Sequence, residues 1–178
     1  MKLRLLLLLT IFFFCAHAQE NIPASIYDFK VAAHNGQTID LAQYKGMKIL
    51  IVNVTSQDEI NRQYAQLEAT YQKYKGKLVV IGFLTEDFLT PPGSKKNMPI
   101  TDKVYNVTFP LAEKVLVRGP NMAPIYKWLT QQKYNKLKDT EIKWDFQKYL
   151  IDENGNLVAE FDPKILATSA AVTAAIER

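Results

Sequence analysis

The hydrophobic pattern combines continuous apolar runs with one segment of helical spacing. Residues 48–54 and 77–84 are almost entirely apolar, which predicts two central strands of a sheet covered on both faces. Between them, apolar residues recur at spacings of four and three, which predicts a helix over 56–74. Ser56 and Glu59 fit an S-x-x-E capping box at its start. These segments together predict a β-α-β unit with a right-handed crossover.

The segments on either side of this unit predict further strands and a helix. Residues 26–41 predict a β-hairpin that turns at Asn35-Gly36. A long surface loop is expected over 90–103, because four prolines and glycines interrupt any periodicity there. Residues 107–117 then predict a strand interrupted by a proline.

The last third of the chain predicts two helices and a second hairpin. Pro124 suits the first turn of a helix that runs to Gln131. Residues 146–151 and 157–161 predict the two strands of a hairpin, and an alanine-rich helix is expected over about 165–176. This order predicts an α/β fold with a mixed central sheet and helices on both faces.

The N-terminus has the features of a secretory signal peptide. Residues 1–18 begin with Lys2 and Arg4, continue with an apolar run, and end on Ala16 and Ala18 in an A-x-A pattern. The apolar run is about half of the roughly 20 residues that a bilayer-spanning helix needs, so no permanent membrane anchor is expected. We therefore expect cleavage after residue 18, export to the periplasm or secretion, and a single domain over 19–178.

Charge and cysteine content exclude several classes of function. Loss of the leader lowers the formal net charge from +4 to about +2, so nucleic acid is not an expected partner. The one cysteine, Cys15, lies inside the predicted leader. Disulfides, thiolate nucleophiles and cysteine-ligated metals are therefore not expected in the mature chain.

Several segments, in this order along the chain, resemble the glutathione peroxidase family. They are SIYDF (25–29), DLAQYKGMKILIVNV (40–54), QYAQLEATYQKYKGK (63–77), VIGF (80–83), VTFPL (107–111), GPNMAPIYKWL (119–129) and IKWDFQKYLIDENGN (142–156). The resemblance implies a thioredoxin-like fold. Only 15 residues separate Trp128 from Trp144, which resembles the shorter, often monomeric members and implies a monomer.

The resemblance also identifies four active-site positions, of which one matches. In that family a cysteine or selenocysteine cleaves the peroxide, helped by a glutamine, a tryptophan and an asparagine. Asp58 stands at the nucleophile position, Asp87 at the glutamine and Asp145 at the asparagine, while Trp144 keeps the tryptophan. A carboxylate cannot pass through the sulfenic or selenenic acid of the thiol cycle. The thiol-dependent peroxidase activity is therefore expected to be lost, leaving a binding or structural role.

Alternative functions remain open at these positions. Asp58 at a helix start can simply cap the helix, since the unpaired N–H groups there favour a carboxylate. If Asp58, Asp87 and Asp145 instead converge, they suggest a site for a hard cation such as Ca²⁺, and otherwise no cofactor is implied. Trp144 can be retained for packing alone. The chain could still be an enzyme, either an atypical peroxidase or a carboxylate- or metal-dependent one; its small-molecule or protein ligand is not identified.

Overall fold

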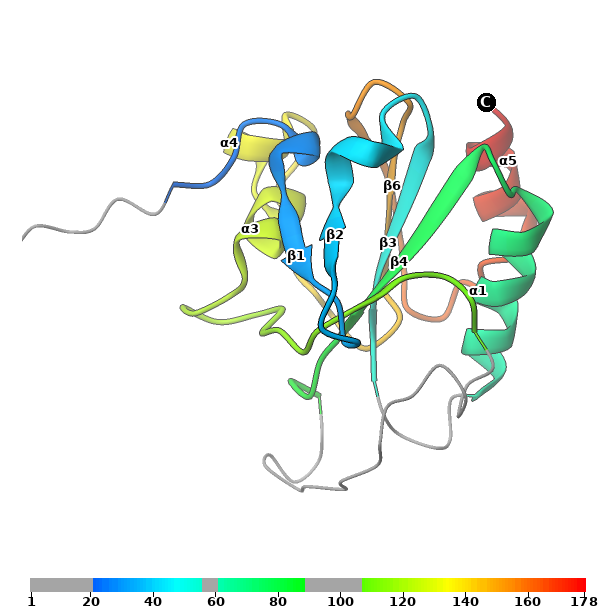
Figure 1. The fold of residues 1–178 in the computed structure, drawn as a ribbon, viewed down its shortest axis with the longest axis horizontal. Helices are drawn as coiled ribbons and strands as arrows, with labels where there is room; N and C mark the ends of the chain where they lie inside the picture. Colours follow the sequence, from blue (N-terminus) through cyan, green and yellow to red (C-terminus); the bar gives the residue numbers. More distant parts are fainter. Residues whose placement is uncertain (1–20, 56–60, 89–106) are drawn as a thin grey trace, which may run out of the picture.

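The computed structural model describes residues 21–55, 61–88 and 107–178 (Figure 1). The first part of the chain contains these elements: η1 (Ile26–Asp28), β1 (Lys30–Ala32), β2 (Thr38–Asp40), η2 (Leu41–Tyr44), β3 (Lys48–Val54), α1 (Asn61–Lys73) and β4 (Leu78–Leu84). The second part contains β5 (Leu111–Ala112), α3 (Pro124–Thr130), α4 (Gln132–Asn135), β6 (Lys148–Ile151), β7 (Leu157–Phe161) and α5 (Ala170–Glu177).

The main sheet has five strands in the order β5-β4-β3-β6-β7. β3 and β4 pair in parallel over seven residues each, and every residue of both strands is buried. β6 pairs with β3 in the antiparallel direction, and β7 pairs with β6 likewise. The continuous apolar runs form the central strands, because only a strand covered on both faces needs apolar side chains at every position. The predicted mixed sheet is confirmed.

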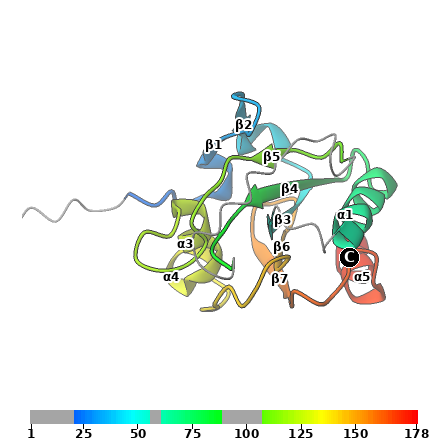
Figure 2. The same ribbon diagram turned by 90° about the horizontal axis from the view of Figure 1, so that it is seen from below.

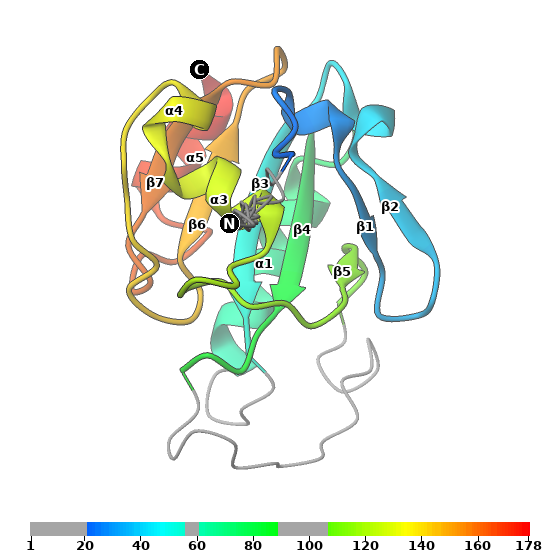
Figure 3. The same ribbon diagram turned by 90° about the vertical axis from the view of Figure 1, so that its left-hand side faces the viewer.

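Helices cover both faces of this sheet (Figure 2). Leu50 and Val52 of β3 point into the core shared with α1 and α5. The alternate residues Ile49 and Ile51 point into the core shared with α3 and the β1–β2 hairpin. This alternation follows from the two-residue period of a strand. Figure 3 shows the hairpin and α3 on either side of β4.

The hairpin and central helix predictions are confirmed where the structure describes them. β1 and β2 pair antiparallel across the Asn35-Gly36 turn, where Gly36 has φ +81°. Helix α1 accounts for the later part of the predicted 56–74 helix. The proposed Ser56 capping box, the loop over 90–103 and the 1–18 leader lie outside the described residues. In the described segments, no helix combines the length and the apolar character needed to cross a membrane.

Two predicted elements are shorter than their patterns indicated. The strand expected over 107–117 pairs only at Leu111–Ala112, because Pro110 has no N–H to donate and Val115 N instead donates to the carbonyl of Leu84, the last residue of β4 (2.9 Å). The helix expected from about residue 165 begins at Ala170. Its N-cap is Ser169, whose hydroxyl accepts from Val172 N (3.4 Å), and the preceding residues form turns.

Candidate functional site

The candidate site lies at the carboxyl ends of the parallel strands β3 and β4. Asp87 follows β4, and Trp144 and Asp145 precede β6. Asn53 near the end of β3 fixes the latter segment, since its carbonyl accepts from Phe146 N (2.7 Å) and its Nδ2 donates to Trp144 O (3.1 Å). Phe146 has φ +67°, a left-handed conformation that a bulky residue rarely adopts. The backbone around Asp145 is thus held in a defined turn.

Asp145 has a buried carboxyl group with a raised pKa. Its residue is only 3% exposed, and its Oδ1 finds no hydrogen-bond partner in the described structure. Burial raises the pKa of Asp145 to about 7, the charge of Asp87 adds to the rise, and Arg118 opposes it. At neutral pH the carboxyl therefore exists in both protonation states and can either donate or accept a hydrogen bond.

Asp87 is held by the backbone of the segment before α3. Its Oδ2 accepts from Val117 N (2.7 Å) and from Arg118 N (3.2 Å), while its own N–H donates to Thr85 Oγ1 (3.2 Å). The Arg118 guanidinium donates to the carbonyl of Asp87 and lies 4.4 Å from the centre of the Phe88 ring. Asp87 is thereby fixed close enough to act electrostatically on Asp145.

Trp144 lies at the surface beside these charges. It is 52% exposed, and its ring centre lies 5.2 Å from that of Phe88 at a tilt of 43°. It does not fill the space between sheet and helix, so packing alone does not explain this side chain. An exposed indole next to a buried carboxyl offers both an apolar face and an N–H donor to a ligand.

Other buried polar groups at this end of the sheet also lack partners. They are Asn53 Oδ1, Thr55 Oγ1 and the hydroxyl of Tyr126, judged over the part of the chain that is described. Burial raises the pKa of Tyr126 well above its usual value, with smaller contributions from Tyr149 and Asp145. Each such group costs about 1–3 kcal/mol of stability. Most buried polar groups in proteins are hydrogen-bonded, so each of these atoms calls for an explanation such as a functional role.

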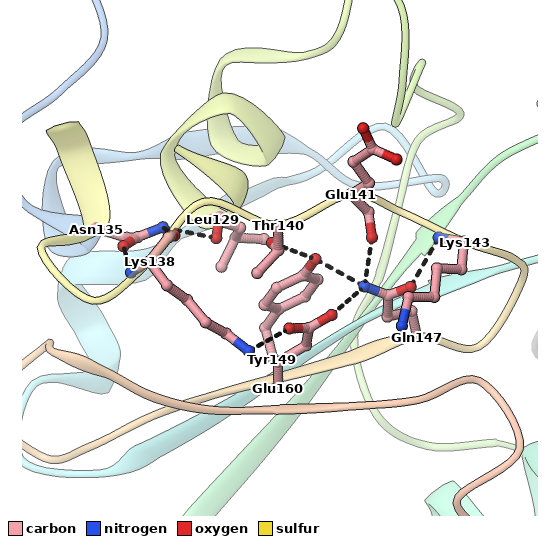
Figure 4. A network of polar contacts seen from close by, with 9 residues as sticks. All are labelled: Leu129, Asn135, Lys138, Thr140, Glu141, Lys143, Gln147, Tyr149 and Glu160. Carbon is pink, nitrogen blue, oxygen red and sulfur yellow. Dashed lines mark hydrogen bonds and ion pairs between the residues drawn. The ribbon is translucent and has the colours of Figure 1, made fainter. Parts of the chain in front are cut away.

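A polar network on the adjoining part of the chain anchors the site (Figure 4). Its centre is Gln147, which is fully buried. The Gln147 Nε2 group lies within donor distance of Glu141 O (2.9 Å), Tyr149 OH (2.9 Å) and Glu160 Oε1 (2.7 Å). Its Oε1 accepts from Lys143 N (2.8 Å). Gln147 thus ties the segment just before Trp144 to β6 and β7.

The same network reaches the loop after α4. Lys138 pairs with Glu160 at 2.7 Å, and Thr140 Oγ1 lies 3.1 Å from the hydroxyl of Tyr149. Asn135 donates to Leu129 O (3.0 Å) and to Lys138 O (2.9 Å), which closes the turn. The connection from α4 to Trp144 therefore has fixed anchor points although it contains no helix or strand.

The structure describes two of the three carboxylates that the sequence predicts to converge. Asp87 and Asp145 come together, whereas Asp58 lies outside the described residues. Over the described ranges, no group of three or more His, Cys, Asp or Glu side chains could hold a metal ion. The predicted cation site stays a prediction, and the positive charge of Arg118 beside the two carboxylates works against it.

Sequence reasoning did not identify Arg118, Tyr126 or Gln147 as parts of this region. Arg118 acts on Asp87, 31 positions away, through its backbone N–H and through its guanidinium, which donates to the Asp87 carbonyl, and no local pattern joins the two residues. Tyr126 and Gln147 occur inside segments that the resemblance covers, but a single sequence gives no sign that their polar atoms are buried. Only the tertiary fold brings these groups together.

Known protein sequences of one family are similar to this chain. The model of the family described as Glutathione peroxidase matches residues 26–130. The chain is 39% identical over 143 residues to the glutathione peroxidase homolog BsaA of Staphylococcus epidermidis, covering 79% of this chain and 90% of the relative. It is 40% identical over 152 residues to a probable phospholipid hydroperoxide glutathione peroxidase of Nicotiana sylvestris, covering 82% and 88%.

Solved structures agree as well. The crystal structure of Trgpx in apo form is similar with 31% identity and a TM-score of 0.68, covering 86% of this chain and 96% of that chain. The thioredoxin domain of a Bacteroides vulgatus thiol-disulfide oxidoreductase has 11% identity and a TM-score of 0.52, covering 84% and 90%, and shows the thioredoxin-like fold alone. The protein has this fold, and its chain belongs to the glutathione peroxidase family.

Proposed function

We propose that this chain is an exported member of the family that has lost thiol-dependent hydroperoxide reduction and keeps a binding or structural role. The observation that carries the proposal is the position of the only cysteine. Cys15 lies in the predicted leader, and the sequence from residue 16 to the end contains no other thiol. By the family resemblance, Asp58 occupies the position of the peroxidatic residue.

Chemistry at the site supports the same proposal. Reduction of a peroxide by a thiol requires an atom that takes up the oxygen and is then restored by a second thiol. A carboxylate oxygen cannot do this. The negative charge of Asp87, and of Asp145 when ionised, would also repel an anionic nucleophile in the same place.

A binding role is supported by the side chains that remain. Trp144 exposes half of its surface beside Asp145, whose carboxyl is available as donor or acceptor at neutral pH. The unpartnered Asn53, Thr55 and Tyr126 atoms add polar groups at the same end of the sheet. We propose a small-molecule or protein ligand recognised by an aromatic face together with a carboxyl group, and a monomeric protein without nucleic-acid partners.

Hydroperoxide turnover tests the loss of activity. The purified mature chain is incubated with hydrogen peroxide or a lipid hydroperoxide and with glutathione or reduced thioredoxin, and peroxide consumption is measured. We expect no consumption above the protein-free blank. Turnover that Trp144→Phe abolishes would contradict the proposal and favour an atypical peroxidase.

A restored variant serves as the matched control for that assay. Asp58→Cys combined with Asp87→Gln and Asp145→Asn should regain measurable turnover, because it returns the thiol and removes the two opposing carboxylates. Asp58→Cys alone should regain less, because Asp87 and Asp145 disfavour the thiolate. The alternative carboxylate- or metal-dependent enzyme predicts instead a stoichiometric divalent metal after native purification, which mass spectrometry would detect.

Export is tested independently of chemistry. Cleavage after Ala18 predicts a mature protein that begins at Gln19. The intact mass of the exported species checks this. A secreted species that retains Cys15, with or without a lipid, would contradict the proposed processing and restore a thiol to the protein.

A further inference from the structure

A groove is lined by β1, by Phe83 of β4 and by the start of α3. Figure 3 shows the position of these three elements in the fold. The cavity volume of the groove is about 560 Å³, within the range of about 300–1,000 Å³ that is typical of ligand pockets. Its walls are mainly apolar, with these residues contributing: Phe29, Val31, Phe83, Val115, Pro124 and Ile125. None of the candidate-site residues Asp87, Trp144 and Asp145 lines it, so this groove is a separate feature of the molecule.

One wall of the groove is the edge of a strand. The carbonyl of Phe29 accepts from η2 at 3.0 Å, and the N–H of Ala33 donates to the turn after it at 2.8 Å. Hydrogen-bonded and non-hydrogen-bonded pairs alternate along an antiparallel ladder, so Val31 between these two bonds to β2. The N–H and C=O of Lys30 therefore point away from β2, toward the groove.

The segment that follows β5 could pair with this edge of β1, but it turns away before it reaches Lys30. Glu113 N donates to Ala32 O (2.8 Å), which extends the pairing on the outer side of β1 by one step. The next amide that could continue it, Val115 N, donates to Leu84 O instead (2.9 Å). Val115, Ala123 and the first residues of α3 form the opposite wall of the groove. This divergence leaves the Lys30 backbone beside an apolar cavity.

We propose that the groove binds an extended apolar peptide segment that carries a basic residue, added as a strand to the free edge of β1. A peptide main chain offers a donor and an acceptor at the spacing of the Lys30 N–H and C=O, and its alternate side chains would enter the apolar cavity. This mode of recognition gains affinity from main-chain hydrogen bonds and specificity from the side-chain pocket.

Charge at the rim selects the basic residue. Lys30 is already paired with Asp40 at 2.8 Å. Asp28 lines the same rim, is exposed, and makes no ion pair with any residue that the structure describes. Among the described residues, Asp28 thus adds a negative charge without an ion-pair partner next to the apolar cavity, and a lysine or arginine of the peptide complements it.

The test uses a defined probe on the whole exported protein. A fluorescein-labelled peptide, acetyl-Val-Lys-Val-Thr-Val-Lys-amide, is titrated with protein up to about 1 mM, and fluorescence anisotropy reports binding. Saturable binding is expected. The same peptide with alternate amides N-methylated should bind at least about tenfold more weakly, because it loses the donors that pair with the strand edge.

Two variants of Lys30 distinguish the contribution of its backbone N–H to binding from that of its side chain. Lys30→Pro removes the outward N–H and should weaken binding at least about tenfold. Lys30→Ala keeps that N–H and should bind within about twofold of the parent. Asp28→Lys should lose the basic peptide and gain a version with glutamate in place of lysine. Circular dichroism and thermal melting confirm that each variant is folded before its binding is compared.

Three results would overturn the proposal that the groove binds a peptide. The proposal fails if the peptide does not bind, or if folded Lys30→Pro binds it as tightly as Lys30→Ala does. It also fails if sedimentation shows concentration-dependent self-association that Lys30→Pro abolishes, since the occupant is then a second copy of this chain. The peroxide assays above do not depend on this groove, so the two outcomes are distinguishable.

Discussion

The acidity of Asp145 links a single side chain to the stability of the whole domain. Its pKa of about 7 in the folded protein exceeds the ordinary value of 3.8. Between these values the folded state holds a proton that the unfolded chain has lost, so the free energy of unfolding falls as pH rises from about 4 to 7. The cost of burying this residue is therefore smallest below about pH 4 and is fully developed above pH 7.

Replacing Asp145 with asparagine should remove this dependence. Relative to the parent, Asp145→Asn should gain up to about 3 kcal/mol in free energy of unfolding between pH 5 and pH 8, since the folded pKa of about 7 lies two units above pH 5 and each unit corresponds to about 1.4 kcal/mol. Urea unfolding at both pH values measures it. Asp87→Asn keeps Asp145, so its free energy of unfolding should still fall with pH. The fall should be smaller than in the parent, because the charge of Asp87 raises the pKa of Asp145. A difference that is the same at both pH values would contradict the assignment.

Lys148 presents the opposite case on the other face of the sheet. Its side chain is fully buried, and its Nζ donates to Phe146 O (2.5 Å) and to Gln63 Oε1 (3.1 Å). Burial lowers the pKa of Lys148 from 10.5 to about 8, while Asp162 opposes the shift. Between pH 8 and 10.5 the unfolded state binds the extra proton, so the contribution of Lys148 to stability rises with pH.

Lys148→Met should abolish that rise. Methionine has a similar length but cannot titrate, so the stability difference between parent and variant should change in favour of the parent from pH 7 to pH 9.5. Chemical unfolding at several pH values in that interval reports the change. Parallel pH profiles for the two proteins would show that Lys148 does not carry the shift.

At the scale of the element, the turn between β6 and β7 depends on a glycine. Gly155 has φ +87°, and a Cβ placed there would lie 2.7 Å from Tyr27 Cε2. Gly76 after α1 has nearly the same φ, +82°, but a Cβ there meets nothing within 4 Å. The two sites share the backbone strain of a left-handed conformation and differ in the steric contact.

The pair of alanine variants separates these two effects. Gly76→Ala should cost about 1–2 kcal/mol, the strain of a left-handed conformation alone. Gly155→Ala should cost more, because the Tyr27 ring and the 2.8 Å bond from its hydroxyl to Glu153 O must shift. Thermal and urea unfolding compare the variants. Equal losses of stability would mean that the ring adapts without cost.

The elements could be predicted where a local pattern depends on burial or on turn-forming residues. β3 and β4 follow from unbroken apolar runs, and the two hairpins follow from Asn-Gly and Asn-Gly-Asn turns. β5 is shorter than its pattern predicts, because no local pattern shows that Val115 N donates to Leu84 O. The start of α5 was placed too early because helix propensity does not reveal the turns that precede Ser169.

The candidate site could be predicted by position but not by environment. The resemblance identified Asp87, Trp144 and Asp145, and the fold brings them to one end of the sheet. Sequence alone could not show that Trp144 is half exposed while its neighbour Asp145 is buried. The next residue, Phe146, has φ +67°, a backbone conformation that no local sequence pattern predicts for a phenylalanine.

At the scale of the whole molecule, the strand order decides which parts of the chain can exist alone. β3 lies between β4 from the first half and β6 from the second half. It pairs with β6 through four residues, from Ile49 with Ile151 to Val52 with Lys148. The stretch that matches the family model, residues 26–130, ends before β6. Expressed by itself, that stretch would present β3 as an unpaired and mainly apolar edge, and it would aggregate rather than form an autonomous folding unit.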